Sequence, residues 1–327
     1  MARAPGLSPA RACGGSNGLK ILVTGGAGFI GSHVVDAFVR AGHTVTVVDN
    51  LATGNPAWVN PGASFRRLDL RSARLGDLFE AERPEVVAHL AAQAAVSRSV
   101  LDPTFDASVN ILGGLNLLDG CRRFGVRRII YSSSGGAGYG DTEVIPTPEG
   151  HPLLPASPYG IAKVAMEHYL AAWGSIYGIS GLALRYANVY GPRQNPVGEA
   201  GVVAIFSHRF LTGQAPVING DGEQTRDYAF VGDVADANLR ALERPAVTGA
   251  VNVGTGIETS VTDLYARLAR AAGVTAPPPH GPARPGEQRR SCLDPGRAAH
   301  ALGWRPTVSL DEGLARTFEF FKKEFGP

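Results

Sequence analysis

The sequence contains little cysteine, and the cysteines that it has are spread along the chain. Among 327 residues there are three, Cys13, Cys121 and Cys292. They lack the spacing of a metal-binding motif and cannot all pair with one another, which argues against a zinc site or a disulfide framework. We therefore expect no metal, and a reducing, cytoplasmic location.

The sequence also lacks long apolar runs and an excess of charge of either sign. No apolar stretch approaches the length of a membrane span, and 31 lysines and arginines are balanced by 29 acidic residues. Nothing here favours a membrane or a nucleic acid as a partner, although a local basic pocket for a phosphorylated ligand stays open. Residues 1–18 are rich in Ala, Gly, Pro and Ser without the apolar core of a signal peptide, and we expect a disordered extension there.

What the sequence does contain is a regular alternation of short apolar runs and helical patterns from residue 20 onward. This alternation predicts an α/β fold, a Rossmann-type doubly wound parallel sheet. Strands are expected at Ile21–Thr24, Thr44–Val48, Ser64–Leu68, Val86–Leu90, Arg128–Ser132 and Leu182–Tyr186. Helices are expected between them, including Pro103–Phe124 and Pro158–Tyr177.

The first apolar run is followed by a turn with glycines at Gly25, Gly28 and Gly31, which opens a helical segment. Such glycines permit a tight turn, the close approach of a pyrophosphate and the packing of helix on strand. Asp49, at the end of the next apolar run, suits the two ribose hydroxyls of NAD and would repel a 2′-phosphate. Either feature alone is weak, because glycine turns are common and Asp49 could be a cap or turn residue. Together they predict NAD binding.

The pattern changes after Asn188, where shorter elements alternate with loops rich in glycine and proline. We expect residues 19–187 to form the NAD-binding Rossmann domain. Residues 188–327 are expected to form mainly a smaller C-terminal α/β lobe that binds substrate, with some segments returning to the first domain. The run Ala276–Arg290 is predicted to be a loop, either a linker or, as we favour, a loop that touches a phosphorylated ligand.

Ser134 and the segment from Tyr159 to Lys163 carry the strongest chemical signal. Tyrosine and lysine four positions apart lie on one face of a helix. A phenol with a pKa near ~10 is a poor base at neutral pH unless positive charge stabilises its anion, which Lys163 and the nicotinamide of NAD can both do. The Ser134 hydroxyl can hydrogen-bond the reacting sugar oxygen or share its proton. Taken alone, the pair could also be an exposed tyrosine and a solvated lysine.

With these motifs in order, the chain resembles the extended short-chain dehydrogenases/reductases, specifically the NAD-dependent epimerase/dehydratase family, from Leu19 to Phe325. The matching segments are Thr24–Gly31, Asp49–Leu51, His89–Gln93, Tyr131–Gly140, Ser157–Gly160 with Lys163, Leu184–Arg193, Gly220–Tyr228 and Arg284–Glu287. The resemblance implies a homodimer formed by the two helices named above. Apolar surface for it is expected at Leu112, Leu115, Leu117 and Leu118.

The resemblance also implies which residues act on the ligands, with Ser134, Tyr159 and Lys163 as the catalytic residues. It implies NAD contacts for Gly25, Gly28, Phe29, Ile30, Gly31, Asp49, Asn50, Leu51, Thr53, Gly54, Asp69, Leu70, Leu90, Ala91, Ala92, Gln93, Asn110, Ser132, Tyr159, Lys163 and Tyr186. It implies UDP-sugar contacts for Ser134, Gly135, Gly136, Tyr159, Asn188, Gly201, Val202, Val203, Val217, Ile218, Asn219, Arg226, Arg284, Glu287 and Ser291.

Among the implied substrate ligands, Arg226 and Arg284 suit a diphosphate. A guanidinium can donate two parallel charge-assisted hydrogen bonds to such a group. An ion pair with Asp227 or Asp233 is the alternative for Arg226. The carboxylate of Glu287 could accept a hydrogen bond from a ribose hydroxyl.

The family includes several reactions, so the fold does not decide the chemistry. Its dehydratases resemble one another in an Asp-Glu pair after the catalytic hydroxyl, where this chain has Gly135 and Gly136, and its decarboxylases place a glutamate nearby. With Ser134, Tyr159 and Lys163 alone, oxidation followed by reduction at one carbon remains. We therefore expect NAD-dependent 4-epimerisation of a UDP-hexose, UDP-glucose or UDP-galactose, through a 4-keto intermediate.

Other readings stay open: a UDP-glucuronic acid 4-epimerase, another nucleotide-sugar oxidoreductase of the family, or a non-catalytic NAD-binding regulator. Asn188 and Asn195 stand where uronic-acid epimerases tend to carry Thr and Arg, which disfavours a sugar carboxylate. Ser291 stands where a bulky tyrosine in some epimerases excludes N-acetyl groups, so we expect some activity on UDP-GlcNAc and UDP-GalNAc. Gly138 replaces the usual Val or Ile, which either widens the pocket or is a neutral change at a packing position.

Overall fold

The computed structural model describes residues 18–196, 201–283 and 288–325. The expected disordered extension lies outside these residues apart from Gly18, as do Arg284 and Glu287 among the predicted substrate ligands. In the described part of the chain, none of the helices combines the length and the apolarity that a membrane crossing requires.

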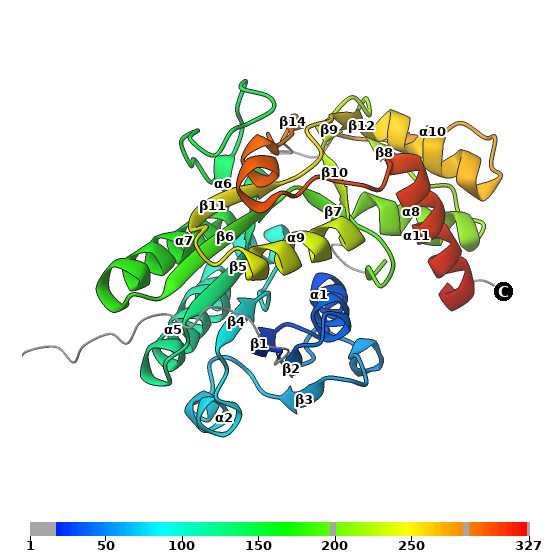
Figure 1. Ribbon diagram of the computed structural model, residues 1–327. Helices are drawn as coiled ribbons and strands as arrows, with labels where there is room; N and C mark the ends of the chain where they lie inside the picture. Colours follow the sequence, from blue (N-terminus) through cyan, green and yellow to red (C-terminus); the bar gives the residue numbers. More distant parts are fainter. Residues whose placement is uncertain (1–17, 197–200, 284–287, 326–327) are drawn as a thin grey trace, which may run out of the picture.

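A seven-stranded sheet forms the centre of the protein (Figure 1), and the pairings within it are parallel. Its order is β3-β2-β1-β4-β5-β6-β11. The strands are β1 (Lys20–Thr24), β2 (Thr44–Asp49), β3 (Ser64–Arg67), β4 (Val86–His89), β5 (Arg128–Ser134), β6 (Ser180–Tyr186) and β11 (Gly249–Val253). The chain runs outward from β1 to β3 and then returns to place β4 beside β1. Ligands bind above the carboxyl ends of the strands at such a reversal.

The predicted fold class is confirmed, and the strands expected from the sequence lie in this sheet with ends that differ by no more than two residues. Strand β11 was not expected from the sequence. This strand lies in the region expected to belong mainly to the second lobe, and it pairs with β6 at the sheet edge, Val251 opposite Leu184. Its sequence, Gly-Ala-Val-Asn-Val, is short and stands among glycine-rich loops, so it carries no clear strand pattern.

Alternate side chains of the central strands belong to two separate apolar cores, one on each face of the sheet. In β1, Ile21 and Val23 belong to one core and Leu22 to the other. Successive side chains of a strand point to opposite sides of a sheet, so a continuous apolar run forms a strand buried on both faces. The helices that close the first core are α1 (Phe29–Arg40) and α9 (Val231–Glu243); those that close the second are α2 (Leu75–Glu82), α5 (Gly113–Arg123) and α7 (Pro158–Tyr177) (Figure 1).

The bounds predicted for α7 agree with the structure, and local signals account for both ends. Ser157 caps the helix, its hydroxyl accepting a hydrogen bond from the Gly160 amide at 3.1 Å, and Pro158 occupies the first helical position. The helix ends at Gly178, whose φ of 71° is the left-handed conformation that glycine adopts without strain. The Ser157 cap therefore fixes the start of α7, and Gly178 fixes its end.

The helical stretch predicted for Pro103–Phe124 is confirmed as far as Arg123, but it is not a uniform α-helix. The chain instead forms α4 (Pro103–Ala107), a π-helical turn η2 (Ser108–Leu112) and then α5. A π-helical turn inserts one extra residue into the helix and is frequent at functional sites. Its physical reason here is Asn110, which is buried and hydrogen-bonds the loop after β4.

The remaining elements include three small sheets, β7 with β10, β8 with β13, and β12-β9-β14, which lie at the carboxyl edge with a third apolar core. The strands are β7 (Asn188–Tyr190), β8 (Ile218–Asn219), β9 (Thr225–Arg226), β10 (Tyr228–Phe230), β12 (Thr259–Ser260), β13 (His280–Gly281) and β14 (Arg290–Ser291). The helices are η1 (Pro56–Trp58), α3 (Val96–Leu101), α6 (Gly135–Tyr139), α8 (Val202–Leu211), α10 (Val261–Ala272), η3 (Ala298–Leu302) and α11 (Leu310–Phe325). The predicted loop Ala276–Arg290 thus contains β13 and the first residue of β14.

Candidate active site

The glycine turn lies between β1 and α1 and has the close contacts that exclude larger residues. Gly25 has φ of 71°, and a Cβ there would lie 2.6 Å from the backbone nitrogen of Ala91. A Cβ on Gly31 would lie 2.0 Å from the Gly25 carbonyl oxygen, so helix and turn are in direct contact. Gly28 is the N-cap and has no side chain to bond the first-turn amides of Phe29 and Ile30. Those amides have no acceptor within the helix and suit an anionic ligand.

Asp49 ends β2 and is tied to this turn. Its carboxylate accepts hydrogen bonds from the amides of Ala27, at 3.1 Å, and Leu51, at 2.8 Å. Asp49 therefore acts as a turn residue, the alternative to a role in NAD binding. The same hydrogen bonds hold its carboxylate beside the glycines. A Cβ on Gly54 would lie 3.0 Å from the same carboxylate, so the glycine allows this part of the chain to pass close to Asp49.

Asp69 follows β3 and lies beside Asn50, whose amide donates to its carboxylate at 2.9 Å. Arg71 donates to the same carboxylate through Nε and Nη2, at 2.9 and 2.8 Å. These hydrogen bonds from Arg71 hold the pKa of Asp69 well below its usual range. Asp69 is thus an ionised group at the outer side of the sheet edge, and Leu70 beside it is buried.

The three predicted catalytic residues lie together where β5 meets α7. Ser134 is the last residue of β5, and its hydroxyl interacts with the Tyr159 phenol. Lys163 is buried, with Nζ donating to the Ser132 carbonyl at 2.7 Å and lying 5.7 Å from the centre of the Tyr159 ring. The reading of Lys163 as a solvated surface residue is therefore wrong. Tyr159 itself is partly exposed.

Burial sets the protonation of this pair. Desolvation raises the pKa of Tyr159 to about 12, the negative charge of Asp106 adds to the rise, and the Ser134 hydrogen bond opposes it. Desolvation lowers the pKa of Lys163 to about 8, against the charges of Asp106 and Glu167. At neutral pH the protein alone therefore holds a neutral phenol beside an ammonium group.

Two residues that were given no role from the sequence are buried beside this pair. The Asp106 carboxylate accepts from Gln93 Nε2 at 3.0 Å and from Asn110 Nδ2 at 2.9 Å. The second is His89, whose Nδ1 bonds the Thr24 hydroxyl at 2.8 Å; burial and then the charge of Lys163 lower its pKa to about 3. The available signal for Asp106 was its position four residues before Asn110 in an otherwise helical stretch.

Asn110 was predicted to touch NAD, and the structure gives its amide a set of protein partners. Its Oδ1 accepts from the Gln93 amide at 2.8 Å, and its Nδ2 donates to the Gln93 carbonyl at 2.9 Å. Asn110 therefore fixes the backbone that follows β4, where Leu90, Ala91 and Ala92 also lie. Ser132 and Tyr186 stand at the carboxyl ends of β5 and β6.

Several predicted substrate residues meet across α6 and β14. A Cβ on Gly135 would lie 2.5 Å from the Leu293 side chain, and one on Gly136 would lie 3.0 Å from Ser291 Oγ. Ser291 in turn pairs in register with Arg226 of the neighbouring strand β9. Of the carboxylates proposed as alternative partners of Arg226, that of Asp227 accepts from Thr255, Gly256 and Leu293 and that of Asp233 from Thr307 and Val308.

The other predicted substrate residues that the structure describes lie between residues 188 and 219. Asn188 begins β7, and Gly201 is the N-cap of α8, which starts with Val202 and Val203. Val217 precedes β8, which consists of Ile218 and Asn219. A Cβ on Gly138 would lie 3.6 Å from Leu153 and from Val164, an ordinary packing contact, which favours the packing reading over a widened pocket.

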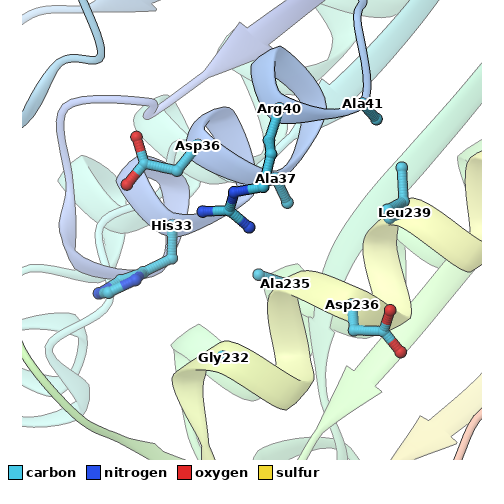
Figure 2. A pocket seen from close by; sticks show the side chains of 9 residues that line it. All are labelled: His33, Asp36, Ala37, Arg40, Ala41, Gly232, Ala235, Asp236 and Leu239. Atoms are coloured by element: carbon cyan, nitrogen blue, oxygen red, sulfur yellow. The ribbon is translucent and has the colours of Figure 1, made fainter.

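A separate groove of about 350 Å³ lies between α1 and α9 (Figure 2). His33, Asp36 and Arg40 line it from α1, and Asp236 lines it from α9, while small residues such as Ala235 let the two helices approach. None of the residues predicted to bind NAD or substrate is among the described residues that line this groove. Two of its lining residues also contact the segment after β7: His33 donates to the Pro192 carbonyl at 2.9 Å, and Asp36 pairs with Arg193 at 2.8 Å.

Comparison with known proteins places this geometry in a family. Residues 21–254 match the NAD dependent epimerase/dehydratase family. The chain belongs to this family. Among its members, a UDP-glucose 4-epimerase of Mycolicibacterium smegmatis is 47% identical to the chain over 311 residues, which cover 94% of this chain and 99% of that protein. The family predicted from the motifs is confirmed.

Solved structures of family members have the same fold. A UDP-glucose 4-epimerase of Thermotoga maritima, with UDP-glucose, is 49% identical and superposes with a TM-score of 0.91, covering 93% of this chain and 99% of the other. A UDP-glucose 4-epimerase of Thermus thermophilus, in complex with NAD, is 46% identical with a TM-score of 0.87, covering 92% and 98%.

Proposed function

We propose that this protein catalyses the NAD-dependent 4-epimerisation of a UDP-hexose, interconverting UDP-glucose and UDP-galactose through a 4-keto intermediate. The observation that carries the proposal is the meeting of Ser134, Tyr159 and Lys163 at the carboxyl end of β5, with Gly135 and Gly136 where an acid pair would stand. The names and ligands of the relatives described above support the same reaction.

The residues of the glycine turn fit NAD. Gly25 and Gly31 allow the turn, α1 and the loop after β4 to lie in direct backbone contact. The first amides of α1 suit a pyrophosphate, and Asp49 suits a diol. When bound, NAD supplies a hydride acceptor for the sugar carbon and then returns the hydride. The protein's part is to bind, orient and move one proton.

Tyr159 moves that proton. Its phenol, with a pKa of about 12 in the protein alone, becomes a base when positive charge lies beside it, and Lys163 contributes one such charge because its pKa of about 8 keeps it protonated at neutral pH. Ser134, which hydrogen-bonds the phenol, can pass the proton between the sugar 4-oxygen and Tyr159. The same groups return the proton after the keto sugar has turned.

Inversion requires that the sugar turn while the nucleotide stays fixed. We assign the fixed end to Arg226, Arg284 and Asn188, since arginines bind a diphosphate with paired hydrogen bonds. The turning end faces Gly135 and Gly136, which have no side chains to hold hydroxyl groups. Weak contact with the sugar and strong contact with the diphosphate are what an epimerase of this kind needs.

Ser291 bears on the choice of sugar. Its hydroxyl lies 3.0 Å from the position of a Cβ on Gly136, so it borders the space we assign to the turning sugar. A serine there occupies less volume than an aromatic ring. We therefore propose that the protein also epimerises UDP-GlcNAc and UDP-GalNAc, at a lower rate than the hexoses.

We also propose a homodimer formed through α7 and the helical segment η2–α5. Exposed apolar side chains gather on these helices and on α3, among them Ile161 and Ile176, 53% and 65% exposed, and Leu112, 61% exposed. Leu117 and Leu118, which were also expected to face a partner, are fully buried in the core instead. Sedimentation at several concentrations should show a dimer, and a monomer throughout would refute this part.

The reaction is tested by incubating the purified protein with a panel of nucleotide sugars and separating C4 epimers by chromatography. UDP-galactose and UDP-glucose should interconvert to the same ratio from either side without added reductant. Tyr159→Phe should keep its fold and lose turnover by about a thousandfold or more, because the general base is removed. Normal turnover in that variant, or release of an oxidised or dehydrated sugar by the parent, would contradict the proposal.

A further inference from the structure

Asp106 is a buried acid in the last turn of α4, and it faces the active site rather than solvent. Its side chain is 1% exposed, and α4 packs against α7, the helix that carries Tyr159 and Lys163. Its Oδ1 accepts from the amides of Gln93 and Asn110. Burying an ionised carboxylate is costly unless it is hydrogen-bonded and its charge is balanced. The two amides supply the hydrogen bonds, but because they are neutral they do not balance the negative charge of the carboxylate.

Among the described residues near α4, the cation buried together with Asp106 is Lys163. Arg71, which lies over the Phe105 ring, pairs with Asp69 at 2.8 Å. The other acid near Lys163 is Glu167, but it already pairs with Arg185 at 2.6 Å. His89 of β4, with a pKa of about 3, is neutral at neutral pH, and Tyr131 of β5 has a pKa raised well above its ordinary value. Arg98 of α3 is exposed and lies over the Phe105 ring, 4.2 Å from its centre.

We propose that Asp106 is the counter-ion of Lys163, a positioning residue that keeps the buried ammonium charged and sets the pH range in which Tyr159 can act. Two fixed amide hydrogen bonds hold the carboxylate in place, and its charge acts on Lys163 and Tyr159 through space across the α4–α7 contact. The part that concerns Tyr159 rests on the proposed function; the part that concerns Lys163 does not.

The charge of Asp106 should shift the pKa values of Lys163 and Tyr159 in the same direction. A nearby negative charge stabilises an ammonium and destabilises a phenolate, so it raises the pKa of Lys163 and of Tyr159 together. Without it, Lys163 should lose its proton at lower pH and Tyr159 should ionise at lower pH. The whole pH–rate profile should then move toward acid, whereas a merely structural change would lower the rate without moving the profile.

Asp106→Asn separates charge from shape. The carbonyl oxygen of asparagine can still accept from Gln93 and Asn110, because both hydrogen bonds go to one carboxylate oxygen. Asp106→Ser is a second neutral variant in case the first does not fold. Asp106→Glu keeps the charge. Asp102→Asn is the matched control: it removes an aspartate from the same short helix, where Asp102 caps the Phe105 amide in an exposed position.

The titration of Lys163 is measured directly in the NAD-free protein, by following the side-chain resonances of isotope-labelled lysine with pH. The sequence has four lysines, Lys20, Lys163, Lys322 and Lys323, so Lys163→Arg assigns the signal. In the parent its midpoint should lie near pH 8. Asp106→Asn and Asp106→Ser should lower it by about one unit, and Asp106→Glu and Asp102→Asn should leave it in place.

The pH–rate profile of epimerisation gives the second readout, with the optimum of Asp106→Asn expected about one unit lower. An unchanged Lys163 midpoint in both neutral variants would overturn the proposal. So would a rate loss in Asp106→Asn with no shift of either limb, which would make Asp106 a structural support for Gln93 and Asn110. If the midpoint moves but the parent has no epimerase activity, the counter-ion stands and the proposed function fails.

Discussion

The Arg185 guanidinium lies against the Glu167 carboxylate, with 2.6 Å between Nη2 and Oε2, and both side chains are almost fully buried. The same carboxylate accepts from the Ser133 hydroxyl at 2.6 Å. On its other side, Arg185 donates to the Tyr139 hydroxyl at 2.8 Å, which donates to Asn252 of β11. This network joins β5, β6, α6, α7 and β11 directly behind Ser134.

Breaking this ion pair should destabilise the protein strongly. Arg185→Met leaves the Glu167 carboxylate buried without its cation, and we expect a loss of about 3–5 kcal/mol in the free energy of unfolding, measured with urea. The matched control is the exposed pair between Arg122 and Asp119, 2.7 Å apart, where Asp119→Asn should cost less than about 1 kcal/mol. Equal losses at the two pairs would show that burial does not distinguish them.

His89 should make the protein sensitive to acid. Burial lowers its pKa to about 3 in the folded protein, while an unfolded histidine has 6.5, so the unfolded state binds the extra proton as the pH falls between these values. Stability from this group is complete above 6.5 and declines below it. From about pH 7 to about pH 4.5 the loss should be about 2–3 kcal/mol.

The test is urea unfolding of the parent and of His89→Asn at the two pH values. Asparagine can keep a hydrogen bond to Thr24 but does not titrate, so the variant should lose about 2–3 kcal/mol less than the parent over this interval. For each protein, the free energy of unfolding at the lower pH is compared with that of the same protein at neutral pH. Parallel pH dependence in the two proteins would rule out His89 as the source.

Gly138 and Gly160 should respond in opposite ways to an added methyl group. The Cβ of Gly138→Ala would meet Leu153 and Val164 at 3.6 Å, so we expect equal or higher stability, by up to about 1 kcal/mol, and unchanged sugar preference. The Cβ of Gly160→Ala would lie 2.4 Å from the Ala137 carbonyl oxygen, which forces α6 away from α7 and should cost about 1–3 kcal/mol. Thermal unfolding compares them. A change of substrate preference in Gly138→Ala would restore the wider-pocket reading.

Ser291→Tyr should narrow the range of sugars. The ring would fill the space beside Gly136, so the rate on UDP-GlcNAc should fall by about tenfold or more while that on UDP-galactose falls less than about threefold. Ser291→Ala, which adds no bulk, is the control and should keep both rates. Parallel losses on the two sugars in Ser291→Tyr would place Ser291 away from the sugar.

The parts of the fold and site that follow from local pattern could be predicted from the sequence. A strand, a glycine turn and a helix leave few arrangements for Gly25 and Gly31, and a carboxylate at the end of the next strand must lie near them. Tyr159 and Lys163 share a helical face because they are four residues apart. Ser134 lies at the same edge as the glycine turn because it ends a strand that runs parallel to its neighbours.

The parts that depend on distant contacts could not. Asp106 looks like any surface aspartate in a helix, and its burial results from the packing of α4 on α7. Glu167 and Arg185 are 18 residues apart on different elements, and the sequence around each residue does not indicate that they form a pair. The π-helical turn adds a single residue to a helix, which the spacing of apolar residues in Pro103–Phe124 does not reveal.

That extra residue makes the length of this segment part of the active site. Removing one residue from Ser108–Leu112 would leave an ordinary α-helical turn in place of the wider π-helical one, and the direction of Asn110 relative to Asp106 would change. Asn110 and Asp106 could then no longer both reach the loop after β4. We expect tolerated changes of length to fall outside this turn, and a one-residue deletion within it to abolish cofactor binding even with every named side chain still present.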